Sequence, residues 1–377
     1  MTGVLLAVPG RLDLPTGGYE YARRVLTVLA PGQARLPLSY WPLPDLGLAP
    51  EGAALDETAR RLAAGPTGWP VLIDGLAFGV LPPAVLDAAQ GPVAALVHHP
   101  LALEHGLGHD DAARLRESER LALGKAEIVI TTSTHTAATL TADYGVPSDR
   151  IAVARPGIPR PAPFEAPVTR LPDGGGAALL SIGTLIPRKG HDVLIGALAE
   201  LRSLPWHLTL IGDPTRDPAH ADRLRMLAVQ LGLEERVSFA GVTDRAGIAA
   251  AYAGADLFVL ASRYEGYGMA YAEAMIAGLP VVGSDAGAVA EATGGGACLV
   301  PPGHVAELAD VLRPLLESAE ARAALADRGR VAARALNDWD ATAAILAEAL
   351  LPFAAGAAKP AEASAGHRPS SKGAARL

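Results

Sequence analysis

The chain has 377 residues, half of them hydrophobic and 19% charged, which excludes global disorder and allows more than one buried core. The net charge is −8 and no segment is a basic block, which argues against a nucleic-acid groove or a polybasic membrane anchor. A single cysteine, Cys298, excludes an intrachain disulfide and a cysteine-based metal site.

The N-terminal segment has a short apolar run with no basic residues ahead of it, so we expect no signal peptide. No uncharged apolar run reaches the roughly 18 residues that a membrane span requires. The composition therefore predicts a cytoplasmic protein without stable membrane insertion and without a nucleic-acid partner.

The first part of the chain alternates short apolar runs with helical patterns. Strands are predicted at residues 4–8, 71–73, 93–97 and 128–132, and helices at residues 19–29 and 110–123. Strands separated by helices predict an α/β domain with a parallel sheet, here over residues 1–157.

A proline- and glycine-rich segment at residues 158–176 is typical of a linker. The alternation then restarts over residues 177–336. Strands are predicted at 178–182, 207–211, 237–239, 257–260, 280–282 and 297–300. Two such domains in tandem are expected to face each other across a cleft.

The end of the chain has two different parts. Residues 337–353 have the spacing of an amphipathic helix, whereas residues 354–377 are rich in Ala, Gly, Ser and Pro without periodicity. We expect the second part to be a disordered tail.

Three segments are expected at the cleft, because ligands of such sheets bind beyond the carboxyl ends of the strands. Residues 183–190 follow a strand and carry Arg188 and Lys189, which suit an anionic group. Residues 262–280 hold Glu265 and Glu273 around a glycine-rich helix start, which suits a polyhydroxylated ligand with a phosphate. Residues 15–19 contain Gly17 and Gly18 but lack GxGxxG spacing, so a dinucleotide site is not predicted.

Together these segments resemble the retaining glycosyltransferases of family 4, also called glycosyl transferases group 1. The run EGYGMAYAEAMIAGLPVV, from Glu265, is similar to the family's E-x7-E motif, and residues 183–190 to its diphosphate loop. The resemblance implies the GT-B fold, with two facing Rossmann-like parallel αβα domains and a deep interdomain cleft. It also implies that residues 337–353 cross back to the N-terminal domain.

The resemblance implies a role for each matching residue. Catalytic roles fall on Glu265, His98, Lys189 and Arg188, with His99 as the alternative to His98. Donor binding is implied for Gly17, Gly18, Thr184, Lys189, Glu265, Gly268, Met269, Ala270 and Glu273. Glu273 is expected to hold the ribose and Lys189 the diphosphate.

One departure concerns the diphosphate. The family usually has Gly-Arg where this chain has Gly183-Thr184, so either Arg188 or Thr184 is expected to replace that arginine. No D-x-D motif follows a predicted strand, because Asp338-Trp-Asp340 falls at the start of the last helix. We therefore expect neither a metal nor any other cofactor.

The expected function is transfer of a hexose-like sugar, with retention and an α-linkage, from a UDP- or GDP-sugar to an unidentified acceptor. The alternatives are a noncatalytic nucleotide-sugar binding module and another enzyme of the same fold, such as a nucleotide-sugar epimerase. A binding module could lose Glu265 and the histidine, and both are present. A phosphorylase would need a pyridoxal-phosphate lysine, for which the chain offers only Lys125 or Lys189 outside its tail.

Overall fold

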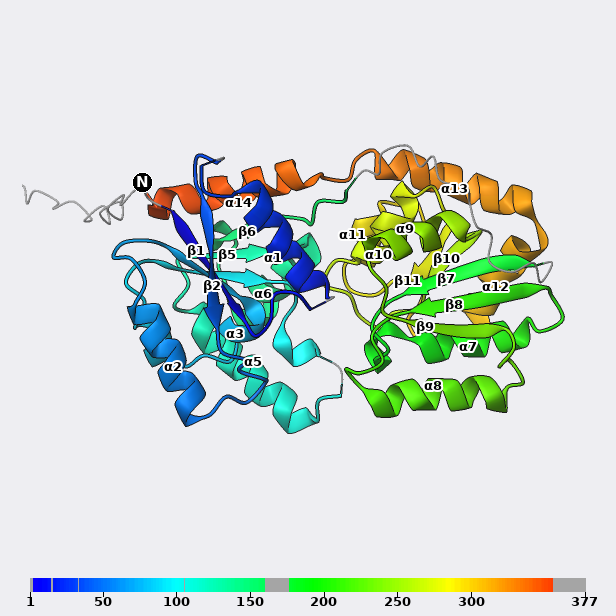
Figure 1. The fold of residues 1–377 in the computed structure, drawn as a ribbon, viewed down its shortest axis with the longest axis horizontal. Helices are drawn as coiled ribbons and strands as arrows, with labels where there is room; N and C mark the ends of the chain where they lie inside the picture. The colour runs from blue at the N-terminus through cyan, green and yellow to red at the C-terminus, as the bar shows by residue number, and fades with distance from the viewer. Residues whose placement is uncertain (1–2, 15, 33, 105, 160–175, 355–377) are drawn as a thin grey trace, which may run out of the picture.

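Two α/β halves lie side by side in the computed structural model (Figure 1). It describes residues 3–354 except residues 15, 33, 105 and 160–175. Most of the expected linker, residues 160–175, and the expected tail from residue 355 onward lie outside the described residues.

The first half is built on a six-stranded parallel sheet with the order β2-β1-β3-β4-β5-β6. Its strands are β1 (Val4–Pro9), β2 (Leu38–Leu43), β3 (Val71–Asp74), β4 (Val93–Val97), β5 (Ile128–Thr131) and β6 (Ile151–Val153). Its helices are α1 (Gly17–Val28), α2 (Gly52–Ala63), α3 (Gly75–Phe78), α4 (Pro83–Leu86), α5 (His109–Leu123) and α6 (Thr134–Tyr144), with 3₁₀ turns at Leu101–Leu103 and Ser148–Arg150.

Alternate side chains of β1 enter two different cores. Leu5 and Ala7 pack with residues of α2, α5 and α6, whereas Val4, Leu6 and Val8 pack with residues of α1 and of the last helix. Every β1 residue is buried, as the period of two requires when helices cover both faces of a parallel sheet.

The second half repeats the plan with the order β12-β11-β10-β7-β8-β9. Its strands are β7 (Ala177–Ile182), β8 (Trp206–Ile211), β9 (Val237–Gly241), β10 (Leu257–Leu260), β11 (Val281–Ser284) and β12 (Cys298–Val300). Its helices are α7 (His191–Glu200), α8 (Pro218–Gln230), α9 (Arg245–Gly254), α10 (Met269–Ile276), α11 (Val289–Thr293), α12 (Val305–Glu317) and α13 (Ala319–Ala333), with a 3₁₀ turn at Pro187–Lys189. One core joins the sheet to α7, α8 and α12, and another joins it to α9, α10 and α13.

The predicted fold class is confirmed: both sheets are parallel and flanked by helices. The two strands missed are β2 and β6, which lie at the edges of the first sheet. β2 contains Pro42, which an edge strand tolerates because one side of its backbone has no ladder partner. Helix α1 also begins at Gly17 and not at Tyr19, so the glycine pair forms its first turn.

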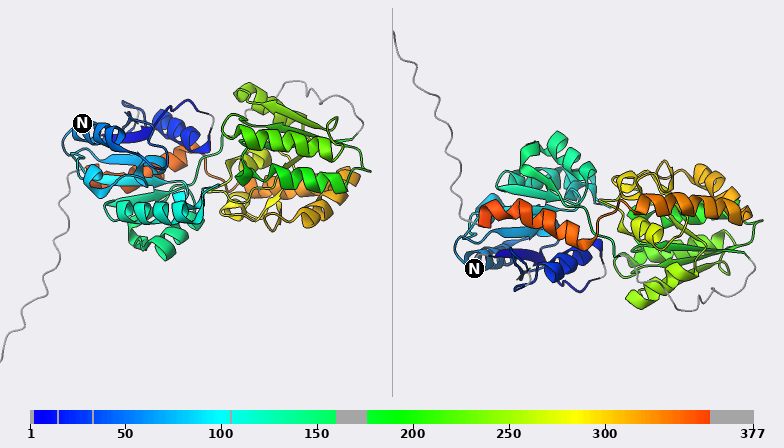
Figure 2. Two further views of the ribbon diagram at one scale, coloured as in Figure 1. Left: turned by 90° about the horizontal axis from the view of Figure 1, so that it is seen from below. Right: turned by 90° about the horizontal axis from the view of Figure 1, so that it is seen from above.

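The last helix, α14 (Trp339–Ala354), belongs to the core of the first half. It lies along α1, whereas α13 lies on the second half (Figure 2). The chain thus crosses between the halves twice, and the crossings touch: Ile158 N–H donates to the Asn337 carbonyl at 2.8 Å. A Cβ at Gly157 would lie 2.3 Å from Trp339 N, so only glycine permits this approach. In the described residues, no helix is long and apolar enough to cross a membrane.

A carboxylate from the second half also contacts the first. Glu291 on α11 accepts hydrogen bonds from Thr134 N–H at 2.8 and 3.0 Å, from Thr134 Oγ1 at 2.6 Å and from His135 N–H at 3.3 Å. It also forms an ion pair with Arg155. Glu291 therefore supplements the Ser133 cap of α6 and satisfies free N–H groups at its N-terminus across the interface. Although burial opposes ionisation, these partners hold the pKa of Glu291 below its usual value.

We expect Glu291→Gln to lower the stability of the contact between the halves by about 1–2 kcal/mol at pH 7, because a charged acceptor is lost. The lowered pKa means that this contribution is present above the pKa of the unfolded chain and disappears as pH falls through the folded value. The thermal midpoints of wild type and variant should therefore converge on acidification below about pH 4.5. Glu348→Gln, at an exposed glutamate in the interior of α14, is the matched control. A constant difference down to pH 3 would contradict this role.

Candidate active site

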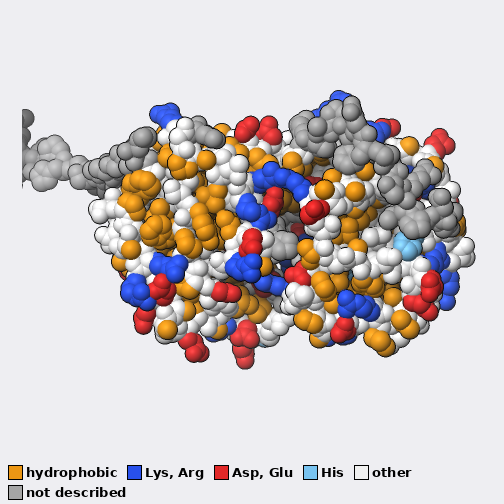
Figure 3. Space-filling view, in the orientation of Figure 1, with side chains coloured by type: hydrophobic (Ala, Val, Ile, Leu, Met, Phe, Trp, Pro, Cys, Tyr) orange, Lys and Arg blue, Asp and Glu red, His pale blue; other side chains and the backbone are white. Residues whose placement is uncertain are grey.

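A cavity of about 980 Å³ opens between the two halves, at the carboxyl ends of both sheets. Residues that follow β1, β3, β4, β7, β8 and β10 line it, together with the first turns of α1 and α10. Charged side chains gather along the middle of the face where the halves meet (Figure 3). Every site residue named from the sequence lines this cavity, including both His98 and His99.

Glu265, in the loop after β10, is the centre of a buried charge cluster. Its side chain is 7% exposed and accepts from Lys189 Nζ and Ser262 Oγ, both at 2.6 Å from Oε1. Arg188 Nη1 lies 3.5 Å from Oε2 and donates to the Tyr264 carbonyl at 2.9 Å. Burial alone would raise the pKa of Glu265, but the two cations and the serine lower it, so the carboxylate is ionised.

Glu273 lies one turn into α10 in a different environment. Its Oε2 is 3.1 Å from Tyr252 Oη, and burial raises the pKa of Glu273 to about 7. The hydrogen bond from Tyr252 only partly opposes that rise. Helix α10 begins after Gly268, whose φ of 103° favours glycine, and Gly268, Met269 and Ala270 all face the cavity. The surroundings of the two glutamates therefore shift their pKa values in opposite directions.

From the first half, the N-terminus of α1 and the loop after β4 face the cavity. A Cβ at Gly18 would lie 3.3 Å from the His98 ring, which also packs edge-on against Tyr21 at 5.5 Å between centroids. Nε2 of His98 lies 3.2 Å from Asp74 Oδ2, at the end of β3. Asp74 is 1% exposed and was not identified from the sequence, although a lone acid ending an apolar strand was a usable signal.

His99 has a separate set of neighbours. Its Nε2 lies 2.7 Å from Glu104 Oε1, and its ring packs against Tyr264 of the second half. Gly266, two residues further along that loop, approaches the His98 carbonyl so closely that a Cβ would lie 2.3 Å from the oxygen. The loop after β10 and the loop after β4 therefore touch through their backbones, and a side chain at position 266 would hold them apart.

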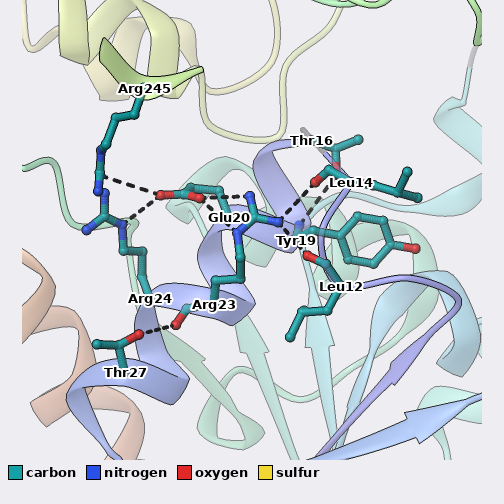
Figure 4. A network of polar contacts seen from close by, with 9 residues as sticks. All are labelled: Leu12, Leu14, Thr16, Tyr19, Glu20, Arg23, Arg24, Thr27 and Arg245. Carbon is teal, nitrogen blue, oxygen red and sulfur yellow. Dashed lines mark hydrogen bonds and ion pairs between the residues drawn. The ribbon is translucent and has the colours of Figure 1, made fainter. Parts of the chain in front are cut away.

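A polar network on the cavity rim was not foreseen (Figure 4). Glu20 of α1 contacts Arg23 at 2.8 Å and Arg24 at 2.7 Å, and Arg245 of α9 approaches from the second half at 3.8 Å. Arg23 also donates to the carbonyls of Leu12 and Leu14. The pairs of Glu20 with Arg23 and Arg24 follow from their spacing of three and four residues on one helix, which a sequence shows. The contact with Arg245 depends on how the two halves pack, which a sequence does not show.

The loop of residues 183–190 follows β7. Thr184 lines the cavity beside Gly183, and Gly190 ends the loop with φ of 64° at the start of α7. A Cβ at Gly190 would lie 1.8 Å from the Ala261 carbonyl oxygen. The loop is therefore pressed against the end of β10, which brings Lys189 to Glu265. In the described part of the chain, no group of three or more His, Cys, Asp or Glu side chains could hold a metal ion.

Part of the chain matches a described family and several curated proteins. Residues 167–332 match the family described as Glycosyl transferases group 1. A D-inositol 3-phosphate glycosyltransferase of Pseudarthrobacter chlorophenolicus is 31% identical over 261 residues, covering 66% of this chain and 61% of that protein. A mannosylfructose-phosphate synthase of Agrobacterium fabrum is 35% identical over 113 residues, covering 28% and 25%. The chain spans about half the length of the curated relatives it matches.

Several solved structures share the fold of the two halves over almost the whole chain. HepE of Anabaena, in complex with UDP and glucose, superposes with a TM-score of 0.70 at 21% identity, covering 93% of this chain and 100% of that one. Sucrose-phosphate synthase from Thermosynechococcus elongatus superposes with a TM-score of 0.74 at 19% identity, covering 93% and 99%. At such identities the likeness establishes the fold. Residues 167–332 therefore match the glycosyl transferases group 1 family, and the chain has the two-domain GT-B fold.

Proposed function

We propose that the chain is a retaining glycosyltransferase that moves a hexose-like sugar from a nucleoside diphosphate sugar to an acceptor hydroxyl, giving an α-linkage. The observation that carries the proposal is the convergence of Lys189, Arg188, Glu265 and Glu273 in one cavity with His98 of the other half. An anionic leaving group and a polyhydroxylated sugar each find matching partners there.

For the donor, we propose a UDP- or GDP-sugar. Neighbours of the same fold are described in complex with UDP and with UDP-glucose, which supports a nucleotide-sugar donor here. Glu273 would accept hydrogen bonds from the ribose hydroxyls, and Tyr252 would orient its carboxylate from behind. Gly17, Gly18 and Thr184 would lie near the diphosphate, with free N–H groups of α1 directed at it.

For the chemistry, we propose that the departing diphosphate is stabilised by side chains and helix ends without a metal. Lys189 and Arg188 would neutralise the charge that builds on it, together with the N-terminus of α10 at Gly268, Met269 and Ala270. Glu265 would face the sugar, whose ring gains positive charge during transfer, and the narrow cleft would limit water. No other cofactor is part of the proposal.

The residues considered so far concern the donor, and they do not identify the acceptor. A cytoplasmic location and an acceptor presented in solution are part of the proposal, since the described helices include none that could span a membrane. The names of the relatives concern phosphorylated polyols and sugars, which supports a small hydroxylated acceptor.

The first test is nucleotide release. Incubation with UDP-, GDP- and ADP-sugars should liberate free nucleotide from one of them, with slow hydrolysis of the donor when no acceptor is present. EDTA should leave the rate unchanged, because cationic side chains serve the leaving group. Tight nucleotide binding without release from any donor would favour a binding module. Loss of activity in EDTA, restored by Mg²⁺ or Mn²⁺, would contradict the metal-free mechanism.

A second prediction concerns Lys189. Lys189→Ala should lower kcat by about tenfold or more, equivalent to about 1.5–3 kcal/mol of charge-assisted interaction lost mainly in the transition state. Lys125→Ala is the matched control, because Lys125 pairs with Asp87 on the surface and should leave kcat unchanged. Steady-state kinetics on variants with wild-type circular dichroism provide the measurement. An unchanged kcat in folded Lys189→Ala would remove this lysine from the mechanism.

A third prediction separates the two glutamates. Glu273→Gln should mainly raise the KM for the donor, because the ribose is the same in substrate and transition state. Glu265→Gln should mainly lower kcat, because a carboxylate beside the sugar matters more once the ring is charged. Product stereochemistry by NMR should show retention. Inversion, or the two effects on the opposite residues, would place the sugar elsewhere in the cleft.

Because the pKa of Glu273 is raised, the affinity for the nucleotide should also depend on pH. Below its pKa of about 7 the carboxyl is protonated and is the weaker acceptor, so nucleotide affinity in wild type should rise between pH 6 and 8. Titration of the nucleotide's own phosphate affects wild type and Glu273→Gln equally. The difference between their calorimetric affinities therefore isolates Glu273, and a constant difference would contradict the assignment.

A further inference from the structure

Asp74 has both carboxylate oxygens committed at the end of β3. Oδ1 accepts from Leu76 N–H at 3.0 Å and so caps the short helix α3. Oδ2 lies 3.2 Å from Nε2 of His98. The side chain is 1% exposed, so its hydrogen bonds go to these two partners and not to solvent.

Several contacts restrict the ring and the backbone of His98. Tyr21 packs edge-on against the ring, at an interplanar angle of 76°, and Gly18 leaves just enough room for its edge. The carbonyl oxygen accepts from Thr132 Oγ1 at 3.2 Å and Thr136 Oγ1 at 3.3 Å. The threonines therefore restrain the backbone, and Tyr21 and Gly18 lie against the ring in an orientation that places Nε2 beside Asp74.

The remaining question is which ring nitrogen carries the proton. A carboxylate oxygen can only accept, so the nitrogen beside Asp74 must be the donor. In a neutral imidazole the other nitrogen, Nδ1, is then an acceptor. In the described residues no hydrogen bond to Nδ1 is present, and the ring lines the cavity with 19% of its side chain exposed.

We propose that Asp74 is a positioning residue that fixes His98 as the Nε2–H tautomer, so that Nδ1 accepts a hydrogen bond from a substrate hydroxyl. The inference rests on the proposed function for the identity of that substrate. It also narrows the substrate class: the group at Nδ1 must be a donor, so a sugar with a hydroxyl there is preferred over one with a carboxylate. A carboxylate would face an acceptor nitrogen with another acid behind it.

One substitution reverses the hydrogen bond with little change of shape. In Asp74→Asn the amide oxygen still accepts from Leu76 N–H, so the cap of α3 is kept. The amide NH₂ then faces Nε2 and donates to it, which forces the proton onto Nδ1. The group that faces the substrate hydroxyl would change from acceptor to donor.

The first measurement does not depend on activity. Long-range ¹H–¹⁵N spectra of the imidazoles at pH 8, with His98 assigned by its disappearance in His98→Gln, should show the Nε2–H form in wild type. Asp74→Asn should show the Nδ1–H form, whereas Glu104→Gln, beside His99, should leave the His98 signals unchanged. An Nδ1–H form in wild type, or an unchanged signal in Asp74→Asn, would overturn the proposal.

The second measurement tests the consequence. Asp74→Asn should lose about tenfold or more in kcat with the sugar donor, while its affinity for the free nucleotide stays within about twofold of wild type. A switched tautomer with wild-type turnover would overturn the positioning role. If wild type shows no transfer with any donor, the proposed function fails, and the spectra still decide whether Asp74 fixes the tautomer.

Discussion

One buried carboxylate fastens the loops of the second half to one another. The side chain of Glu265 binds Lys189 from the loop after β7 and Ser262 from the loop after β10, and its main-chain carbonyl accepts from Ala288 N–H at 3.0 Å. Gly287 approaches that carbonyl so closely that a Cβ would lie 2.3 Å from the oxygen. Three loops from separate strands therefore meet at one residue and together form one wall of the cavity.

Burying the ion pair of Glu265 and Lys189 costs solvation energy, and that cost affects how the pair would meet a ligand. Withdrawing Glu265 and Lys189 from water is expensive. The Glu265 charge is compensated further by the hydrogen bond from Ser262 and by Arg188 at 3.5 Å, whereas burial lowers the pKa of Lys189 although Glu265 opposes that shift. An anionic ligand entering the cavity would share Lys189 with Glu265 and restore part of the solvation that the lysine gave up. The cluster therefore forms a wall of the cavity, and its lysine would also contribute to the binding of an anionic ligand.

The buried strands were easier to predict from the sequence than the edge strands of the first sheet or the contacts between residues far apart in the chain. Strands with continuous apolar runs, such as β1, β4 and β10, were found because both of their faces are buried. β2 and β6 were missed because their apolar patterns are interrupted or short and only partly buried, whereas β9 and β12, at the edges of the second sheet, were predicted. The site residues in contiguous motifs all reached the cavity, since each motif is one loop with a fixed strand before it.

Partners from distant parts of the chain could not be found in this way. Asp74 meets His98 only because β3 and β4 are neighbours, and Tyr252 meets Glu273 only because α9 packs beside α10. Single acids and tyrosines are common in any sequence, and their importance depends on the residue that the fold brings opposite. The start of α1 was placed too late for a local reason, because a glycine pair is typical of a turn and is rare inside a helix.

The packing of α14 has a consequence for synthesis on the ribosome. The face of the first sheet that carries Val4 and Leu6 is completed by Trp339 and Leu346, which lie about 180 residues beyond Ile158. At about 5–20 residues per second, roughly 10–40 seconds separate emergence of the two parts. The second half can complete its sheet in that interval, whereas the first half waits with an apolar face uncovered. The half made first is therefore the last to finish folding, and during that wait the nascent chain is most exposed to aggregation and to chaperones.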